Sequence, residues 1–193
     1  MAKHSVLIAA AICMTWVSSV LAQDFSADGV SRDTRGHVVN SKVYKGSGKV
    51  RVDSLEPTPP NGASYLILDL HQRTSYAVLP SRRLYLQQGA AMSRTALALF
   101  DVGDTPCRGA ASGVTCQKLG VETVNGRGAE KWKVDQTLMG RAFSMTLWID
   151  PVLHVVVKSE SPVGGAELDH IVLGPQPASL FVIPAGFTQM GGR

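Results

Sequence analysis

The sequence predicts a mainly β (α+β) protein, built as one curled antiparallel sheet of about ten to eleven strands with one or two helices on its concave face. Three observations lead to this prediction. Short runs of alternating apolar and polar residues follow one another, separated by turn residues. Strands and helices do not alternate along the chain, so a parallel sheet is not expected. A single antiparallel sheet of this size must curl, because flat open sheets of more than about ten strands are rare.

The strands are expected where period-two alternation lies between Gly, Pro, Asn or Asp residues. In chain order these runs are 25–31, 38–44, 49–52, 64–70, 74–79, 83–87, 118–124, 129–135, 142–149, 153–160 and 167–173. Asn125-Gly126 predicts a tight hairpin, because both residues tolerate positive φ. The proline-rich stretch 55–62 predicts a loop.

One helix interrupts the strands. Met92, Ala96, Leu99 and Phe100 fall near helical spacing, with Ser93 as a candidate N-cap, so we expect a helix over 92–100 that lies as a lid on the sheet. A second short helical or turn segment is expected at 177–181.

The N-terminus has the pattern of a secretory signal peptide. Lys3 precedes an apolar run, and small residues at Val20 and Ala22 fit a cleavage site after Ala22. An uncleaved N-terminal anchor is the alternative. With cleavage, residues 23–193 form a single domain in the periplasm or secreted medium, not spanning a membrane.

Composition excludes several classes of protein. The chain has 193 residues, is 45% hydrophobic and 18% charged, and carries a formal charge of +4, so it is neither collagen, coiled coil nor mainly disordered. Its basic residues are scattered and lack interleaved aromatic residues, so we expect no nucleic-acid partner.

After signal cleavage two cysteines remain, Cys107 and Cys116. In an oxidising compartment this pair predicts one disulfide across a short glycine-containing loop. A redox pair or half of a metal site is the alternative reading, but redox cysteines usually lie closer together, and no ligand cluster flanks these two.

No catalytic or metal-binding motif is found. The sequence has no G-x-S-x-G, H-E-x-x-H or P-loop pattern, and no spacing typical of metal ligands, so we expect no cofactor, no metal and no enzymatic activity. A hydrolase whose site assembles only in space is kept as an alternative.

Several strands are apolar on both alternation phases, which indicates either packing on both faces or an apolar groove. The groove reading predicts a hydrophobic ligand. Its candidate lining residues are Leu66, Leu68, Tyr76, Val78, Trp132, Phe143, Met145 and Leu147.

The order of short motifs resembles the LolA/LolB-like superfamily, in particular an uncharacterised exported bacterial family within it. The matching positions are Asp69, Thr74, Tyr76, Leu79, Pro80 and Tyr85, then Gly120, Glu122, Val124, Asn125, Gly126, Lys131 and Val134, and finally Phe181, Ile183, Pro184, Gly186, Phe187 and Met190. The resemblance implies an incomplete antiparallel β-barrel around helices, with a hydrophobic concave cavity. It implies lipid or acyl-chain binding as a carrier or sensor. An envelope protein partner, with no ligand, is the alternative function.

Overall fold

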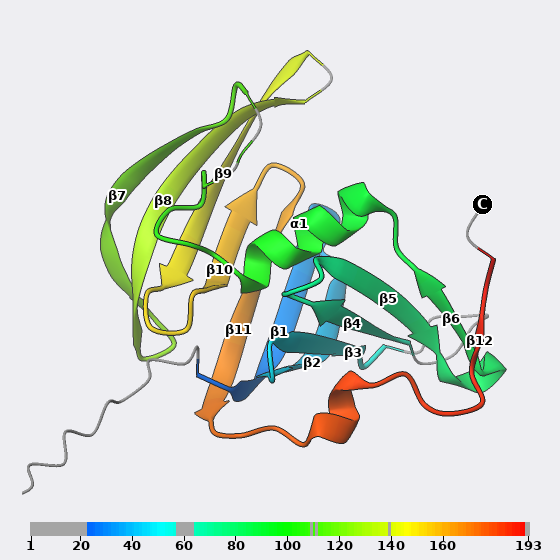
Figure 1. Cartoon of the computed structure of the whole chain (residues 1–193). Helices are drawn as coiled ribbons and strands as arrows, with labels where there is room; N and C mark the ends of the chain where they lie inside the picture. Colours follow the sequence, from blue (N-terminus) through cyan, green and yellow to red (C-terminus); the bar gives the residue numbers. More distant parts are fainter. Residues whose placement is uncertain (1–22, 57–63, 109, 111, 139, 192–193) are drawn as a thin grey trace, which may run out of the picture.

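The computed structural model describes residues 23–56, 64–108, 110, 112–138 and 140–191. Within these ranges twelve strands form one sheet in the order β12-β6-β5-β4-β3-β2-β1-β11-β10-β9-β8-β7 (Figure 1). Their bounds are β1 Phe25–Asp33, β2 Val38–Gly46, β3 Lys49–Ser54, β4 Tyr65–Asp69, β5 Thr74–Leu79, β6 Leu84–Gln87, β7 Thr115–Val124, β8 Arg127–Leu138, β9 Arg141–Asp150, β10 Val155–Ser161, β11 Gly164–Leu173 and β12 Thr188–Gln189.

The sheet is an unclosed half-barrel, as predicted. Antiparallel pairing of β1 with β11 joins the first strand to the C-terminal half of the chain, and β7 and β12 remain as edges. The sequence expectation of ten to eleven strands missed β12, which is two residues long and pairs in parallel with β6. Period-two patterning cannot reveal so short a strand.

The predicted hairpin at Asn125-Gly126 is confirmed. Val124 pairs with Arg127, and both turn residues have positive φ, 47° for Asn125 and 78° for Gly126. This is the backbone of a two-residue turn whose twist matches that of the flanking strands.

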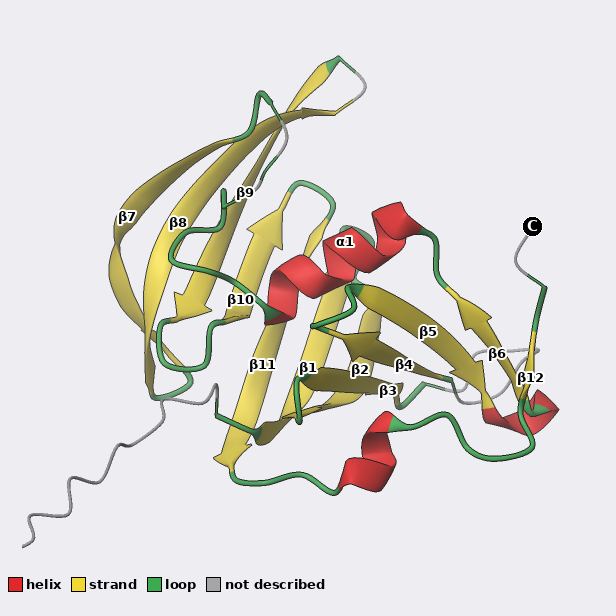
Figure 2. Ribbon diagram, in the orientation of Figure 1, coloured by secondary structure: helices red, strands yellow, loops and turns green. Residues whose placement is uncertain are grey.

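Helix α1 (Ala90–Phe100) crosses the concave face of the sheet (Figure 2). It begins two residues earlier than predicted, and its N-cap is Gly89, so the prediction of Ser93 as N-cap is wrong. Ser93 is instead buried, and its hydroxyl lies 2.8 Å from the Ser75 hydroxyl on β5. The Ser93 hydroxyl therefore makes a polar contact with the sheet and does not cap the helix.

The C-terminal segment covers the opposite face of β3 to β6. The short 3-10 helix η2 (Ala178–Phe181) contacts β3, and Ile183 and Phe187 pack against Tyr65, Ile67 and Val78. Of the two predicted helical segments in the described part of the chain, only α1 therefore covers the concave face, and the second lies on the other side. A second 3-10 helix, η1 (Pro80–Arg82), joins β5 to β6.

The loop after α1 carries the predicted disulfide, Cys107–Cys116, which is confirmed. Val102, Val114 and Cys116 from this loop and the start of β7 pack against residues of β8 to β10. The predicted signal peptide lies outside the described residues.

No helix in the described ranges is both long and apolar enough to span a bilayer.

Candidate functional site

An apolar cavity of about 240 Å³ lies between α1 and the sheet. Six strands, β1 to β4, β10 and β11, form its floor, and one face of α1 forms its roof. The lining residues are Gly29, Val30, Ser31, Ser41, Val43, Val52, Leu66, Leu68, Ala96, Leu99, Phe100, Val156, Val157, Ser159, Ala166, Glu167 and Leu168. Most of these side chains are apolar, as in sites that take hydrophobic ligands.

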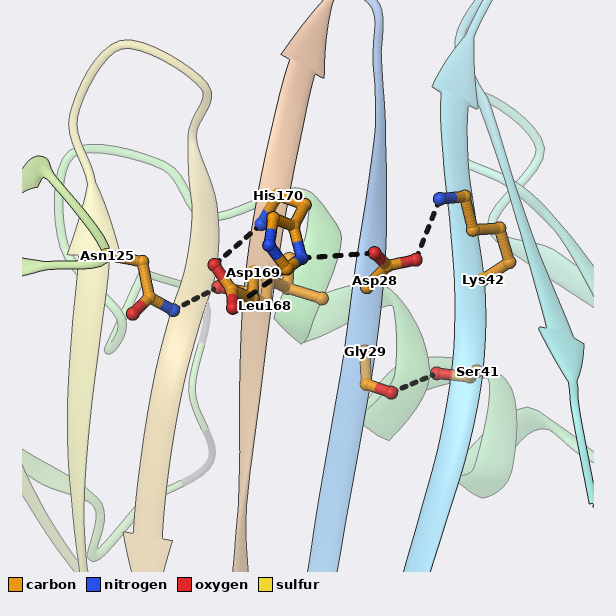
Figure 3. Close-up of polar contacts among 8 residues, drawn as sticks. All are labelled: Asp28, Gly29, Ser41, Lys42, Asn125, Leu168, Asp169 and His170. Carbon is orange, nitrogen blue, oxygen red and sulfur yellow. Dashed lines mark hydrogen bonds and ion pairs between the residues drawn. The ribbon is translucent and has the colours of Figure 1, made fainter.

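Small residues leave this space open. Gly29 on β1, Ala166 on β11 and Ala96 on α1 all line the cavity where longer side chains would fill it. A Cβ at Gly29 would collide with the Ser41 hydroxyl, which donates a hydrogen bond of 3.3 Å to the Gly29 carbonyl (Figure 3). The cavity therefore follows from residue choice at facing positions of β1, β11 and α1.

The roof is held by burial of one face of α1. Leu97 is 1% exposed and Phe100 is 9% exposed, and each such side chain contributes about 1.5–3 kcal/mol by leaving water. Beyond the helix the Val102 amide donates to the His154 carbonyl, which ties the chain to the β9–β10 turn. Ala96 and Leu99 lie beside the buried stripe, at the cavity.

The structure brings together some of the predicted groove and lid residues. Leu66 and Leu68 on β4 line the cavity together with Ala96, Leu99 and Phe100. Met92 does not, because its side chain is 65% exposed on the outer side of the helix. A helix of this length has several apolar positions, and spacing alone does not choose the buried stripe.

Tyr76 and Val78 lie on the opposite face of the sheet. Val78 pairs with Tyr65, whereas Leu66 and Leu68 pair with Ala77 and Ser75, so the side chains of β5 that share a face with Leu66 are the odd-numbered ones. Both phases of β4 are buried, because the C-terminal segment covers the second face. The sequence offered no means of choosing the phase at these strands.

Trp132, Met145 and Leu147 form a separate cluster. They pack with Val102, Val114 and Cys116 of the disulfide-bonded loop, outside the cavity. Phe143 is half-buried further along β9, where it pairs with Gln136, and it shares the face of Met145 and Leu147. Trp132, Met145 and Leu147 thus lie beneath the loop, and none of the four lines the cavity under α1.

The sequence prediction missed the part of the cavity formed by β1, β2, β10 and β11. Gly29, Val43, Val157 and Leu168 carry that wall. The run Val155-Val156-Val157 signals burial of β10, but nothing in the sequence shows that β1 pairs with β11.

Lys45 is a buried cation beyond the cavity floor. It follows Val43 on the same face of β2, is 4% exposed, and its Nζ donates a hydrogen bond of 2.9 Å to the Leu153 carbonyl. Burial lowers the pKa of Lys45, while Asp101 and Asp24 act in the opposite direction. Because Lys45 does not line the cavity, it supplies no charge to a ligand there.

A polar cluster occupies the face opposite α1 (Figure 3). Lys42 forms an ion pair of 2.7 Å with Asp28, and the hydrogen bond from Lys42 is the main reason why the pKa of Asp28 lies below its ordinary value. His170 Nδ1 lies 3.2 Å from Asp28 and 3.6 Å from Asp169. In the described ranges no group of His, Cys, Asp or Glu side chains is arranged to hold a metal ion.

No protein-family model and no curated protein sequence matches the chain. Solved structures do match. An uncharacterized conserved protein from Thermus thermophilus is 13% identical, with a TM-score of 0.55 over 90% of this chain and 93% of that one. A chain of the Pseudomonas aeruginosa MucA/MucB complex is 17% identical, with a TM-score of 0.53, and covers 85% of this chain.

This chain spans 56% of the matched chain of the MucA/MucB complex, about half its length. At these identities the likeness shows the fold alone. A LolA superfamily protein from Nitrosomonas europaea also matches, at 12% identity and a TM-score of 0.39 over 83% of this chain and 90% of that one. The half-barrel expected from the sequence is the fold observed, an open antiparallel sheet with a helix across its concave face.

Proposed function

We propose that this chain is a non-enzymatic binding protein for a lipid-like ligand, which it carries or senses in the bacterial periplasm. The observation that supports this proposal is the cavity under α1, which is apolar, bounded by a helix and a sheet, and kept open by Gly29, Ala96 and Ala166. A packed core fills such space with side chains, so unfilled apolar space at the roof of a sheet favours a ligand.

The size of the cavity supports a slender ligand. Its volume of about 240 Å³ lies just below the range of about 300–1,000 Å³ typical of sites for drug-sized molecules. One acyl chain suits this space better than a bundle of several chains.

The compartment follows from the N-terminal pattern and from the disulfide. Residues 1–22 have the order of charge, apolar run and small residues that export signals show. A disulfide such as Cys107–Cys116 persists in oxidising compartments and is rare in the cytosol. Both features support export to the periplasm, the compartment in which a lipid carrier between membranes works.

The test is to fill the cavity from its roof. Ala96→Phe places a ring in the cavity, whereas Ala98→Phe, two residues along the same helix, places the same ring on the exposed side. We expect the wild-type protein and Ala98→Phe to bind one fluorescent fatty acid per chain, and Ala96→Phe to lose at least tenfold in affinity. A folded wild-type protein that binds no apolar probe, or an equal loss in both variants, contradicts the proposal.

An envelope interaction module is the second candidate, and the edge strand β7 favours it. Its ten residues pair with β8 on one side only, and Leu119 and Val121 are 48% and 67% exposed. Such an edge accepts a further strand from a partner. The matched MucB chain was solved as a complex with MucA, which makes a protein partner a reasonable expectation for this fold.

Site-specific photo-crosslinking tests this second candidate. A photoreactive residue at Val121 is expected to capture one discrete envelope protein in the cell. The same residue at Val172, which is 63% exposed on β11, serves as the control. Equal capture at both positions, or none at Val121, contradicts the edge-strand reading.

A further inference from the structure

One end of the cavity is polar, and its polar groups are hydroxyls. Ser31 on β1, Ser41 on β2 and Ser159 on β10 line this end. A second depression, of about 320 Å³, lies between the β1–β2 and β10–β11 turns. Ser31 and Ser159 line both the cavity and this depression, so the two spaces adjoin there. In Figure 1 the β10–β11 turn lies beyond α1, at the upper end of the sheet. The apolar space therefore opens past a line of serines.

Two of these hydroxyls are free to meet a ligand. Ser31 pairs with Ala166, and Ala166 pairs with Ser159, so the three residues form one row across β1, β11 and β10 on the cavity side. Adjacent strands lie about 4.8 Å apart, which places the two serines about 10 Å apart with only a methyl group between them. Neither hydroxyl has a hydrogen-bond partner within the described residues, whereas Ser41 donates to the Gly29 carbonyl.

The charges near this end do not suit an anionic headgroup. The one charged residue among the described cavity-lining residues is Glu167, and its carboxylate accepts a hydrogen bond of 2.7 Å from Asn125 Nδ2. Among the described residues no cation lines the cavity itself, and in the adjoining depression the positive charge of Arg32 is offset by the negative charge of Asp33, the next residue along the chain. A negative group placed there loses hydration and gains no charge partner.

The second depression is of mixed polarity. Arg32, Asp33 and His37 line it together with Val39, Val163 and two glycines. Asp33 accepts hydrogen bonds from the backbone amides of Arg35 and His37, so it is a fixed negative group beside Arg32. Donors and acceptors side by side suit hydroxyl groups, which both donate and accept.

Resting on the proposed function, we propose that the ligand is a single-chain acyl ester with an uncharged, hydroxyl-bearing headgroup. Its chain lies under α1, and its headgroup hydrogen-bonds to Ser31 and Ser159 and extends into the second depression. Free fatty acids, which share the chain but carry a carboxylate, bind more weakly. Headgroup selection is thus assigned to the serine row and chain binding to the space beneath the helix.

The test compares two lipids that share one chain. Affinities of 1-monopalmitoylglycerol and of palmitate are measured at pH 8 and low ionic strength by displacement of one fluorescent probe. We expect the glycerol ester to bind at least fivefold more tightly than palmitate. The double variant Ser31→Ala/Ser159→Ala removes two hydroxyls and is expected to weaken glycerol-ester binding about 5–10-fold, with palmitate changed less than twofold.

Ser26→Ala is the matched control, because Ser26 is on β1 but on the opposite face from Ser31. It should leave both affinities unchanged. Equal binding of the two lipids to the wild-type protein, or equal losses for both lipids in the double variant, overturns headgroup selection and leaves the proposed function intact. Failure of both lipids to bind, with Ala96→Phe indistinguishable from Ala98→Phe, overturns the proposed function itself.

Discussion

Replacing Asp150 tests how the roof of the cavity is anchored. Asp150 is 1% exposed, and its Oδ1 accepts hydrogen bonds from the amides of Val152 and Leu153, at 2.8 Å and 3.0 Å. Its Oδ2 forms an ion pair with Arg127 Nε. The turn held in this way presents the His154 carbonyl to Val102, at the end of α1. Asp150 therefore links the β9–β10 turn to the helix.

The expected magnitude follows from these three contacts. Hydrogen bonds to a charged group contribute about 1.5–3 kcal/mol each, and breaking a buried ion pair from one side costs about 3–5 kcal/mol. The Arg127 side chain is 25% exposed and regains water when it is left alone, and the three contacts are not additive. We therefore expect Asp150→Ala to lower the free energy of unfolding by about 3–4 kcal/mol.

Asp150→Asn separates the turn from the ion pair. Asparagine keeps an oxygen that accepts the two amide hydrogens but removes the charge facing Arg127, so we expect a loss of about 1–2 kcal/mol. Urea denaturation followed by tryptophan fluorescence measures both variants. A loss below 1 kcal/mol for Asp150→Ala, or equal losses for the two variants, refutes the assignment of the turn as the anchor.

Three further predictions use the same urea assay. The double variant Cys107→Ser/Cys116→Ser should lower the free energy of unfolding by about 2–3 kcal/mol, because the disulfide closes a loop with a sequence separation of 9. A reductant should destabilise the wild-type protein and not the double variant. An equal effect of the reductant on the two proteins contradicts a stabilising disulfide. Leu97→Ala should cost about 2–4 kcal/mol, and Met92→Ala under about 0.5 kcal/mol; similar losses would mean that the buried face of α1 is misassigned. Lys45→Met should abolish the part of the pH dependence of the free energy of unfolding that Lys45 causes. Since burial holds the folded pKa of Lys45 below its ordinary 10.5, the folded protein releases this proton first, and wild-type stability should rise relative to the variant as pH increases through that window, so parallel curves contradict the burial.

Local patterns in the sequence predicted most of the sheet, because each strand carries its own alternation and each tight turn its own residues. Asn125 and Gly126 both have positive φ at the hairpin that this dipeptide predicts. Val155 to Val157 and Leu147 to Ile149 are buried, as their apolar runs indicated. These features depend only on neighbours along the chain.

The cavity could not be predicted in the same way, because it depends on which faces meet. Gly29 and Leu168 line it only because β1 pairs with β11, a contact between the two ends of the chain. Val78 and Tyr76 face away because the segment after 181 covers the other side of β5, which a two-sided apolar strand cannot reveal. Ser93 is buried against Ser75, and a contact between helix and sheet cannot be told from an N-cap by local sequence.

Native mass spectrometry of the protein, purified gently from the periplasm, is the most direct test of a lipid-binding cavity. We expect a bound species with the mass of a single-chain acyl ester, lost in Ala96→Phe and retained in Ala98→Phe. A protein purified from the same cells with no adduct, and with none after incubation with 1-monopalmitoylglycerol, would contradict the claim that the cavity is a lipid site.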